Sequence, residues 1–170
     1  MLLQIAEGSP QAVAAQDQAA WLALFSDDAE VHDPVGARPH PKPGLGAFWN
    51  TFIAGNGIRF LVDRDLVCGE MVIRDLTIET TFPGGVQLMV PAHLRYHVVD
   101  GRLRRLYAHW ELLAMVVLVI KKGPGAWWAM TGVSLAMIRY LGIGGLLAYL
   151  GGLRGVGRGG KAKAMALCGQ

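Results

Sequence analysis

The chain has 170 residues, of which 52% are hydrophobic and 17% charged, a composition that excludes a protein disordered throughout. Its length fits one domain with an additional segment, because single domains most often have about 100–150 residues. The two cysteines, Cys68 and Cys168, form no CxxC pair, which excludes a disulfide framework and a cysteine-built zinc site. We therefore expect a reducing, cytoplasmic environment.

Charge is divided unevenly along the chain. Residues 1–111 carry all 13 acidic residues and nine of the 16 basic ones, whereas residues 112–170 carry seven basic residues and no acidic one. The body is therefore acidic and the tail basic. An apolar run of nine residues begins at the same boundary, at Leu112. We predict two units, residues 1–113 and residues 114–170.

Several motifs with a known chemistry are missing from the sequence. It contains no GxxxxGK[ST], HExxH or GxSxG motif, which argues against P-loop nucleotide hydrolysis, zincin proteases and serine hydrolases. Residues 1–5 lack the basic region and apolar stretch of a signal peptide, so export is not expected.

Three helices are expected in the first third of the chain. Ser9 followed by Pro10 is typical of a helix start, because the hydroxyl can accept a backbone N–H and proline needs no N–H at the first helical position. Asp17 can cap a second helix that ends near Asp27. The apolar stripe of this helix comprises Trp21, Leu22, Leu24 and Phe25. A third helix is expected over residues 45–54.

The segment HDPVGARPHPKPG, residues 32–44, separates the second and third helices. It contains four prolines and two glycines, too many for a helix interior. We expect a short strand or turn followed by a loop, with His40 exposed to solvent.

Period-two alternation begins at Ile58 and predicts strands. We place them over residues 58–62, 72–82, 86–99 and 103–113. Asp100 and Gly101 between the last two are a strong hairpin signal. Helices followed by an antiparallel meander indicate an α+β fold.

Particular segments carry a family resemblance. They are DQAAWLALFSDDAEVHDPVG at residues 17–36, with its specific run DDAxVxDPxG, the aromatic pair at residues 48–49, and HLRYHVVDGRLRRLYAHWE at residues 93–111. Together they resemble the ketosteroid isomerase branch of the nuclear transport factor 2-like superfamily, which also contains SnoaL-like polyketide cyclases. The resemblance covers about 110 residues and implies a cone-shaped, curved, mainly antiparallel sheet packed against three N-terminal helices. It also implies an apolar small-molecule ligand of the steroid or polyketide class and no cofactor.

The resemblance further implies a catalytic residue. The aspartate of the DP motif, Asp33, would be the general base that removes a proton next to a carbonyl of a bulky apolar substrate. The family's tyrosine and acid, which hold the resulting enolate, fall at Ser9 and Ala92, so both donors are missing. We predict that His93, beside Ala92, substitutes for them. The alternative function, which the missing donors favour, is a non-catalytic protein that binds a small hydrophobic ligand.

Large apolar residues are expected to line the pocket, with plain core as the open alternative. They are Phe25, Phe48, Trp49, Phe52, Phe60, Met71, Phe82, Met89 and Trp110. His109 precedes Trp110 in a strand and should therefore lie on the opposite face, as should His32 relative to Asp33. We expect no metal site, because the spacing of the histidines and Asp33 matches none that chemistry justifies.

The tail allows two interpretations. Residues 126–150 would reach about 37 Å as one helix, enough to cross a bilayer core. Arg139 and several glycines oppose this, so we predict two shorter helices separated near Gly142. Trp127, Trp128 and Tyr140 suit the interface of an anionic membrane. The basic residues at the flanks of this segment are Lys121, Lys122, Arg154, Arg158, Lys161 and Lys163.

The second interpretation is that the basic tail packs on the acidic body or on a second subunit. Nucleic acid is not expected as a partner, because the basic residues are sparse among aliphatic ones. Deleting residues 115–170 should leave a folded body and change oligomeric state or membrane partitioning. The family resemblance implies a homodimer, and the localisation expected is cytoplasmic, peripheral to the inner face of a membrane. The glycine-rich stretch from residue 151 onward predicts no fixed structure.

Overall fold

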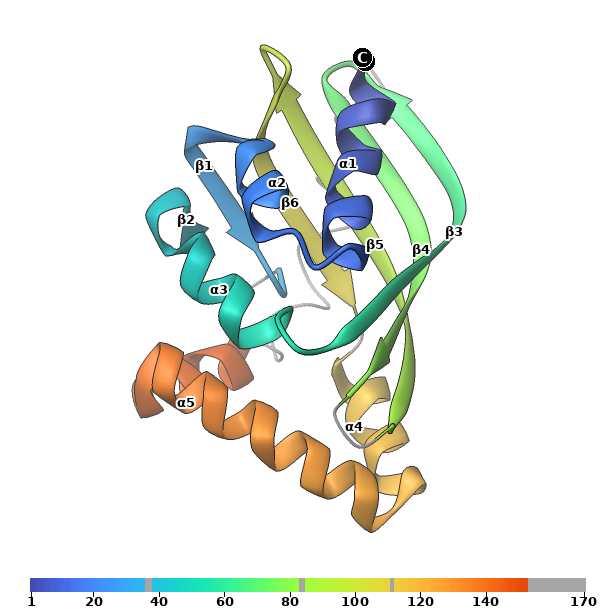
Figure 1. Ribbon diagram of the computed structural model, residues 1–170, viewed down its shortest axis with the longest axis vertical. Coiled ribbons are helices and arrows are strands. Elements are labelled where there is room, and N and C mark those ends of the chain that lie inside the picture. Colours follow the sequence, from blue (N-terminus) through green and yellow to red (C-terminus); the bar gives the residue numbers. More distant parts are fainter. Residues whose placement is uncertain (36–37, 83–84, 111, 153–170) are drawn as a thin grey trace.

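The computed structural model describes residues 1–35, 38–82, 85–110 and 112–152. In chain order, the elements are α1 (Leu2–Ala14), α2 (Gln18–Ala23), β1 (Phe25–His32), β2 (His40–Pro41), the 3-10 turn η1 (Lys42–Gly44), α3 (Leu45–Phe52), β3 (Gly57–Cys68), β4 (Met71–Thr81), β5 (Gln87–Val99), β6 (Arg102–Trp110), α4 (Leu112–Lys122) and α5 (Pro124–Gly152). The N-terminal helices pack on one face of a curved sheet, and α5 crosses one end of it (Figure 1). The predicted α+β class is confirmed.

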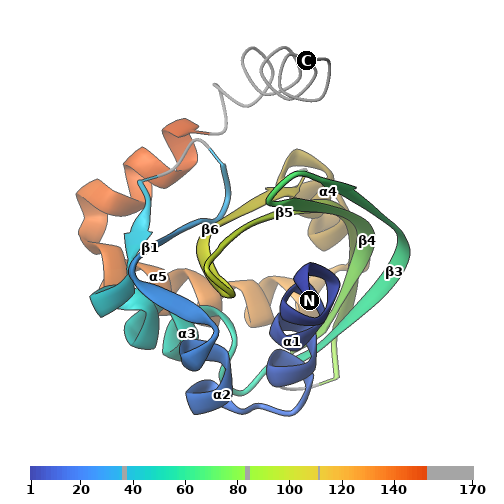
Figure 2. The ribbon, with the colours of Figure 1, turned by 90° about the horizontal axis from the view of Figure 1, so that it is seen from above.

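The sheet has the strand order β2-β1-β6-β5-β4-β3. All neighbouring pairs are antiparallel except β1 and β6, which run parallel with Val31 opposite Leu106. Irregularities in register at residues 62–64 and 97–98 accompany the bending of the long strands. Seen from above, the sheet curls around α1 (Figure 2).

Alternation along β5 separates an inner face from an outer face. Leu88, Val90, Ala92, Leu94, Tyr96 and Val98 are buried on the inner face. Met89 and His93, which alternate with them, are exposed on the outer face. Helices α1, α2 and α3 cover the inner face, and the core lies between them and the sheet.

Trp21 of α2 is the centre of this core. It is 2% exposed, and its ring centroid lies 4.6 Å from that of Phe25, 5.5 Å from that of Trp49 and 6.1 Å from that of Phe48. Its Nε1 donates a hydrogen bond to Ser9 Oγ at 3.1 Å. The indole therefore joins the three N-terminal helices to the start of β1.

The predicted start of the first helix at Ser9 is wrong, because α1 begins at Leu2 and contains Pro10 in its interior. Proline has no N–H to donate to the carbonyl four residues earlier, here that of Ala6. Arg74 Nη1 lies 3.5 Å from this carbonyl oxygen and donates to it. A side chain of β4 thus satisfies the acceptor that the proline leaves free.

The second helix is shorter than expected. Asp17 caps it as predicted, since its carboxylate accepts from Ala20 N at 2.9 Å. The helix ends at Ala23, however, and Asp27 lies in β1 rather than at a helix terminus. Leu24 O accepts from Leu103 N of β6, so pairing with a distant strand fixes this boundary.

The later elements follow the predicted pattern except at two ends. The first strand, β3, continues to Cys68, whereas the prediction ended it at residue 62. The third helix and four long strands are confirmed, and Asp100 and Gly101 have φ angles of 50° and 74°, as a type I′ hairpin turn requires. The last strand ends at Trp110 rather than Leu113, because the apolar run starting at Leu112 is helical. Pro83 and Gly84, which connect β4 and β5, lie outside the described residues.

Helices α4 and α5 pack on the body. Val119 and Ala126 form a second apolar cluster with Phe82 and Leu88 at the end of the sheet. The predicted break near Gly142 is confirmed, since this residue has non-helical angles of φ 70° and ψ 170° within α5. Among the described residues, no helix is both long and apolar enough to cross a membrane. The glycine-rich stretch from residue 153 lies outside them.

Candidate functional site

Asp33 follows the last residue of β1 on the inner side of the sheet. Trp110 Nε1 donates a hydrogen bond to Asp33 Oδ1 at 2.7 Å. Trp110 stands opposite the buried Ala92, so the indole is on the inner face as predicted. Burial raises the pKa of Asp33 to about 6, against the smaller opposing effect of the Trp110 hydrogen bond. The carboxyl group therefore changes protonation state near neutral pH.

His40 is the second polar group at this place, and the prediction that it is exposed is wrong. Its side chain is 4% exposed because His40 pairs with Val31 of β1, whose side chain is buried in the core. Burial lowers the pKa of His40, and a hydrogen bond between its ring and the backbone of Asp33 opposes this shift. Nε2 has no hydrogen-bond partner in the part of the chain that the structure describes.

The ring of His40 lies among aromatic side chains from two other helices. Its centroid is 4.9 Å from Phe48 and 6.5 Å from Phe52, both of α3, and 5.6 Å from Tyr140 of α5. Tyr140 Oη lies 3.0 Å from His40 Nδ1 and 3.4 Å from the carbonyl oxygen of Gly44. Burial raises the pKa of Tyr140, so it stays a neutral phenol.

Sequence reasoning missed both of these residues as part of one site. It treated His40 as a loop residue and Tyr140 as a membrane anchor. The pairing of β2 with β1 is only two residues long, and Tyr140 is 100 positions from His40 in the chain. A pattern of neighbouring residues in the sequence therefore predicts neither the burial of His40 nor its contact with Tyr140.

The structure does not bring His93 to Asp33. His93 lies on the outer face of β5, its side chain 66% exposed, and Nδ1 is 2.6 Å from Asp75 Oδ1. Ala92, the preceding residue, faces the core, and a one-residue step reverses the face. His32 also lies on the outer side, stacked on Tyr107 at a centroid distance of 4.5 Å.

The predicted apolar lining divides into three groups. The first group lies at Asp33 and His40 and comprises Phe48, Phe52 and Trp110. The second group belongs to the main core or packs on it and comprises Phe25, Trp49 and Phe60. Phe82 packs with α4 and α5 in the second cluster. The expectation that Met71 and Met89 line the interior is wrong, since β4 and β5 place them on the outer face opposite each strand's buried positions.

A buried ionic cluster lies elsewhere on the inner face, between α1 and the sheet. The Arg74 guanidinium is 2% exposed and bonds both carboxylate oxygens of Asp65 at 2.7 Å and Glu7 at 2.8 Å. The Tyr96 hydroxyl beside it has no hydrogen-bond partner of standard geometry among the described residues, and burial raises the pKa of this phenol. This cluster fastens α1 to β3 and β4.

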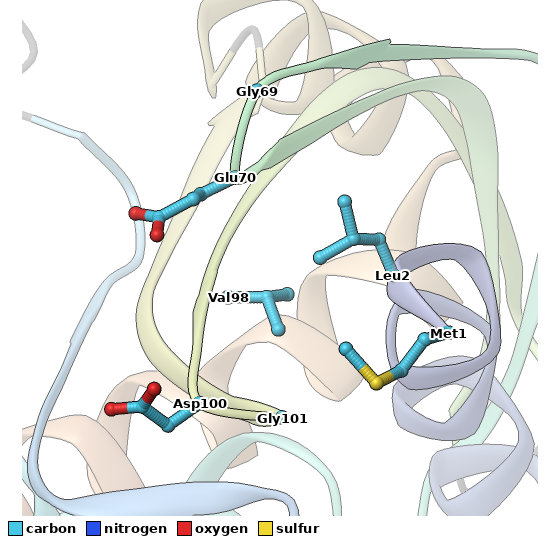
Figure 3. Close-up of a pocket in the computed structure, with 7 residues that line it drawn as sticks. All are labelled: Met1, Leu2, Gly69, Glu70, Val98, Asp100 and Gly101. Atoms are coloured by element: carbon cyan, nitrogen blue, oxygen red, sulfur yellow. The ribbon is translucent and has the colours of Figure 1, made fainter.

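A shallow pocket of about 400 Å³ lies at the opposite end of β6 from Trp110. It is lined by Met1, Leu2, Gly69, Glu70, Val98, Asp100 and Gly101. Figure 3 shows the carboxylates of Glu70 and Asp100 pointing away from the apolar side chains. Glu70 Oε2 lies 3.4 Å from His97 Nε2, but the Glu70 side chain is 66% exposed and points away from the apolar lining, so we assign the candidate site to Asp33.

The described residues contain no group of three histidine, cysteine or carboxylate side chains that could hold a metal ion. The side chains at Asp33 provide a carboxylate that can accept a proton, an imidazole and an apolar wall.

Comparison with known proteins identifies the family. Residues 6–106 match the family model of the SnoaL-like domain. The chain belongs to the SnoaL-like family. No curated protein matches this chain.

Solved structures of SnoaL-like and related proteins share the fold. The Δ5-3-ketosteroid isomerase from Mycobacterium sp. is 29% identical with a TM-score of 0.62, and the match covers 66% of this chain and 95% of that one. The protein RV0760c from Mycobacterium tuberculosis, solved in complex with estradiol-17β-hemisuccinate, is 26% identical with a TM-score of 0.60, over 65% of this chain and 94% of that one.

A third match confirms the fold alone. An NTF2-like protein of unknown function from Burkholderia pseudomallei K96243 is 18% identical with a TM-score of 0.61, covering 69% of this chain and 95% of that one. The predicted membership of the NTF2-like superfamily is thus confirmed. Trp110 and Tyr140 both lie beyond the matched residues 6–106, so the candidate site includes side chains from outside the matched segment.

Proposed function

We propose that the protein catalyses proton transfer next to a carbonyl group of a bulky apolar substrate of the steroid or polyketide class, with Asp33 as general base. The observation that carries this proposal is the half-buried Asp33 carboxyl, which accepts a hydrogen bond from Trp110 and whose pKa is raised to about 6. A general base with a pKa near the working pH is largely ionised and still has a high affinity for the proton that it removes. The likeness to a Mycobacterium ketosteroid isomerase supports the steroid class.

The reaction follows from these groups. The Asp33 carboxylate removes a proton from the carbon next to the carbonyl, and the electron pair of that C–H bond moves toward the carbonyl oxygen to form an enolate. The protonated Asp33 then returns the proton to a second carbon, which shifts the double bond into conjugation. Apolar surroundings keep water away from the enolate.

The test uses ultraviolet absorbance to measure how fast a conjugated enone forms from a β,γ-unsaturated 3-ketosteroid, at pH values across pH 4–9. We expect kcat/KM to rise through about pH 6 and then level off, because only ionised Asp33 accepts the proton. A rate that does not change between pH 5 and pH 7 would contradict this assignment.

The alternative function is that of a non-catalytic carrier of a small hydrophobic ligand. The complex of RV0760c with a steroid ester favours it, since that protein shares the fold and 26% of the aligned residues. Steroid binding without enone formation would select this alternative over catalysis.

We also propose a homodimer formed through the outer face of the sheet. Exposed apolar side chains on that face include Leu61, Leu66 and Met89. Exposed apolar surface of this kind marks association sites on soluble proteins. Sedimentation velocity should therefore give the mass of two chains, and the mass of one chain would contradict the proposal.

The tail supports a further proposal, that α4 and α5 lie on an anionic membrane surface. Their outward side exposes large apolar side chains, namely Val117, Ile120, Trp127, Trp128, Leu135 and Ile143. Lys121, Lys122 and Arg139 are exposed beside them. Exposed aromatic and basic residues on two neighbouring helices suit anionic headgroups.

The replacement Trp128→Ala should weaken binding to phosphatidylserine vesicles severalfold, because Trp128 is 79% exposed and would insert its indole at the interface. Co-flotation measures this, with Val67→Ala as the matched control, since Val67 is 52% exposed on β3. Equal flotation of both variants and the unaltered protein would contradict membrane docking by α5.

A further inference from the structure

Helix α5 crosses the same end of the sheet at which the candidate site lies. Strand β1 leads into Asp33 and β6 ends at Trp110, and both strands run toward the end that α5 crosses (Figure 1). Binding sites for small molecules cover most of the surface of their ligand. A bulky substrate that reaches Asp33 from this end therefore has to pass between α5 and the body.

Helix α5 packs on the body at two separate places. In its first turn, Ala126 is 1% exposed and packs with Phe82 and Leu88. Near the break at Gly142, Tyr140 packs against the main core. The exposed residues between these two places include Thr131, Ser134, Leu135 and Arg139. We call residues 124–141 the bridging segment, because its two ends are held while these residues between them are exposed to solvent.

The Tyr140 hydroxyl holds the far end of the bridging segment. Its Oη lies 3.0 Å from His40 Nδ1 and 3.4 Å from the Gly44 carbonyl oxygen. Both hydrogen bonds are satisfied when His40 Nδ1–H donates to Tyr140 and Tyr140 donates to Gly44. The phenol ring also stacks on His40 at 5.6 Å and meets the edge of Phe52 at 6.2 Å. Tyr140 thus covers His40, whose ring also bonds the backbone of Asp33.

The bridging segment lies between two glycines with positive φ. Gly123 separates α4 from α5 and has φ 79°, and Gly142 follows the segment with φ 70°. A Cβ atom added to either glycine would meet no described atom within 4 Å, so the chain has room to move at both positions. Hinges are typically a few residues at the ends of elements that absorb changes in φ and ψ. The two glycines suit this function.

We propose that the bridging segment is a lid that controls the entry of the substrate to Asp33, with Gly123 as its hinge and Tyr140 as the residue that holds it closed. This inference rests on the proposed function and assigns the tail a direct part in it. In the closed form, the Tyr140 ring fills the space over His40 and Phe52. When both hydrogen bonds of Tyr140 break, the segment turns about Gly123 and the passage beside His40 opens.

The first test needs no ligand and measures how often the lid opens. The change Gly44→Cys places a thiol beneath Tyr140, because a Cβ atom at Gly44 lies 3.7 Å from Tyr140 Oη. The full-length chain is used, with Cys68 and Cys168 replaced by serine. Labelling of the new thiol by a maleimide should become about tenfold faster when Tyr140→Phe is added, since the loss of two hydrogen bonds shifts an opening equilibrium by about that factor.

Gly46→Cys is the matched control for labelling. A Cβ atom at Gly46 lies 3.7 Å from Gln18 Nε2, and no atom of α5 is among its close neighbours. Adding Tyr140→Phe should leave the labelling rate of this thiol unchanged. If Tyr140→Phe changes labelling at Gly44→Cys less than about twofold, or accelerates labelling at both positions equally, the lid is overturned.

The second test measures the entry of a ligand by stopped-flow tryptophan fluorescence. The probe is estradiol-17β-hemisuccinate, the steroid ester in the complex with RV0760c. Tyr140→Phe should raise the association and dissociation rate constants together, about tenfold each, while Kd changes less than about threefold. This pattern is expected because the same hydrogen bonds close the lid before and after binding. A damaged binding site would instead raise the dissociation rate constant and Kd without faster association.

Tyr107→Phe is the matched control for entry, because it removes a hydroxyl from the outer face of the sheet, where Tyr107 stacks on His32. Circular dichroism checks that each variant is folded. If the steroid binds and Tyr140→Phe has the rate constants of the unaltered protein, the lid is wrong and the proposed function still holds. If the unaltered protein neither binds the steroid nor forms the enone, the proposed function fails and the inference fails with it.

Discussion

Replacing Asp33 with asparagine is expected to lower kcat/KM for enone formation on the order of 1,000-fold. General bases typically contribute between about 100-fold and 10,000-fold, and an amide cannot accept the proton at neutral pH. Asparagine keeps the size of the side chain and an oxygen that can still accept from Trp110 Nε1. The variant should therefore bind the steroid normally, which equilibrium binding measures.

Asp63→Asn is the matched control, since Asp63 is an exposed carboxylate of β3. It should retain full turnover. Equal activity of both variants would contradict the role of Asp33 as base, whereas equal loss would indicate a general effect of the substitution.

The same substitution has a predicted effect on stability. The pKa of Asp33 is raised to about 6 in the folded protein from 3.8, so the folded state binds the proton more tightly. The unaltered protein therefore loses stability as pH rises from about 4 through 6. Asp33→Asn lacks this loss and should gain free energy of unfolding relative to the unaltered protein over that range, which urea titration at several pH values measures.

Arg74→Met is expected to destabilise the fold by about 3–5 kcal/mol. The Arg74 guanidinium is 2% exposed and pairs with Asp65 and Glu7, and it donates to the Ala6 carbonyl left free by Pro10. Removing it leaves carboxylates near the core without a counter-charge. Chemical denaturation measures the loss.

Arg64→Met is the control for this prediction. Arg64 also lies in the sheet and bonds a carboxylate, Asp75, at 2.7 Å, but its side chain is 69% exposed. An exposed pair contributes about 0–1 kcal/mol. The double variant Arg74→Met with Asp65→Asn should recover part of the stability. Similar small losses of stability in Arg74→Met and Arg64→Met would contradict the prediction that burial makes the ion pairs of Arg74 important for stability.

Local patterns were sufficient for the features that neighbouring residues determine. Alternation predicted β4 and β5, Asp100 with Gly101 predicted the hairpin, and Gly142 predicted the break in α5. The placement of Asp33 and Trp110 on the inner side followed from the resemblance to the family and from strand alternation. In each case the information lies within a few residues.

The errors arose where a distant partner decides the outcome. Pro10 lies inside a helix because Arg74, 64 residues later, donates to the carbonyl that proline leaves free. His40 is buried because a two-residue strand joins β1 and because Tyr140 covers it from α5. The error at His93 has a local cause instead, since His93 follows Ala92, whose side chain faces the core, and the next residue of a strand faces the opposite side.

The parallel pairing of β1 with β6 has a consequence for how the protein folds. Strands from the two ends of the domain meet there, Val31 with Leu106, so the ordering entropy of a loop of more than 70 residues opposes this contact. The hairpins of β3 to β6 are local and can form first. During synthesis, β1 can therefore pair with β6 only after β6 has left the ribosome. The carboxyl group at the end of β1 reaches its indole partner only at this late step.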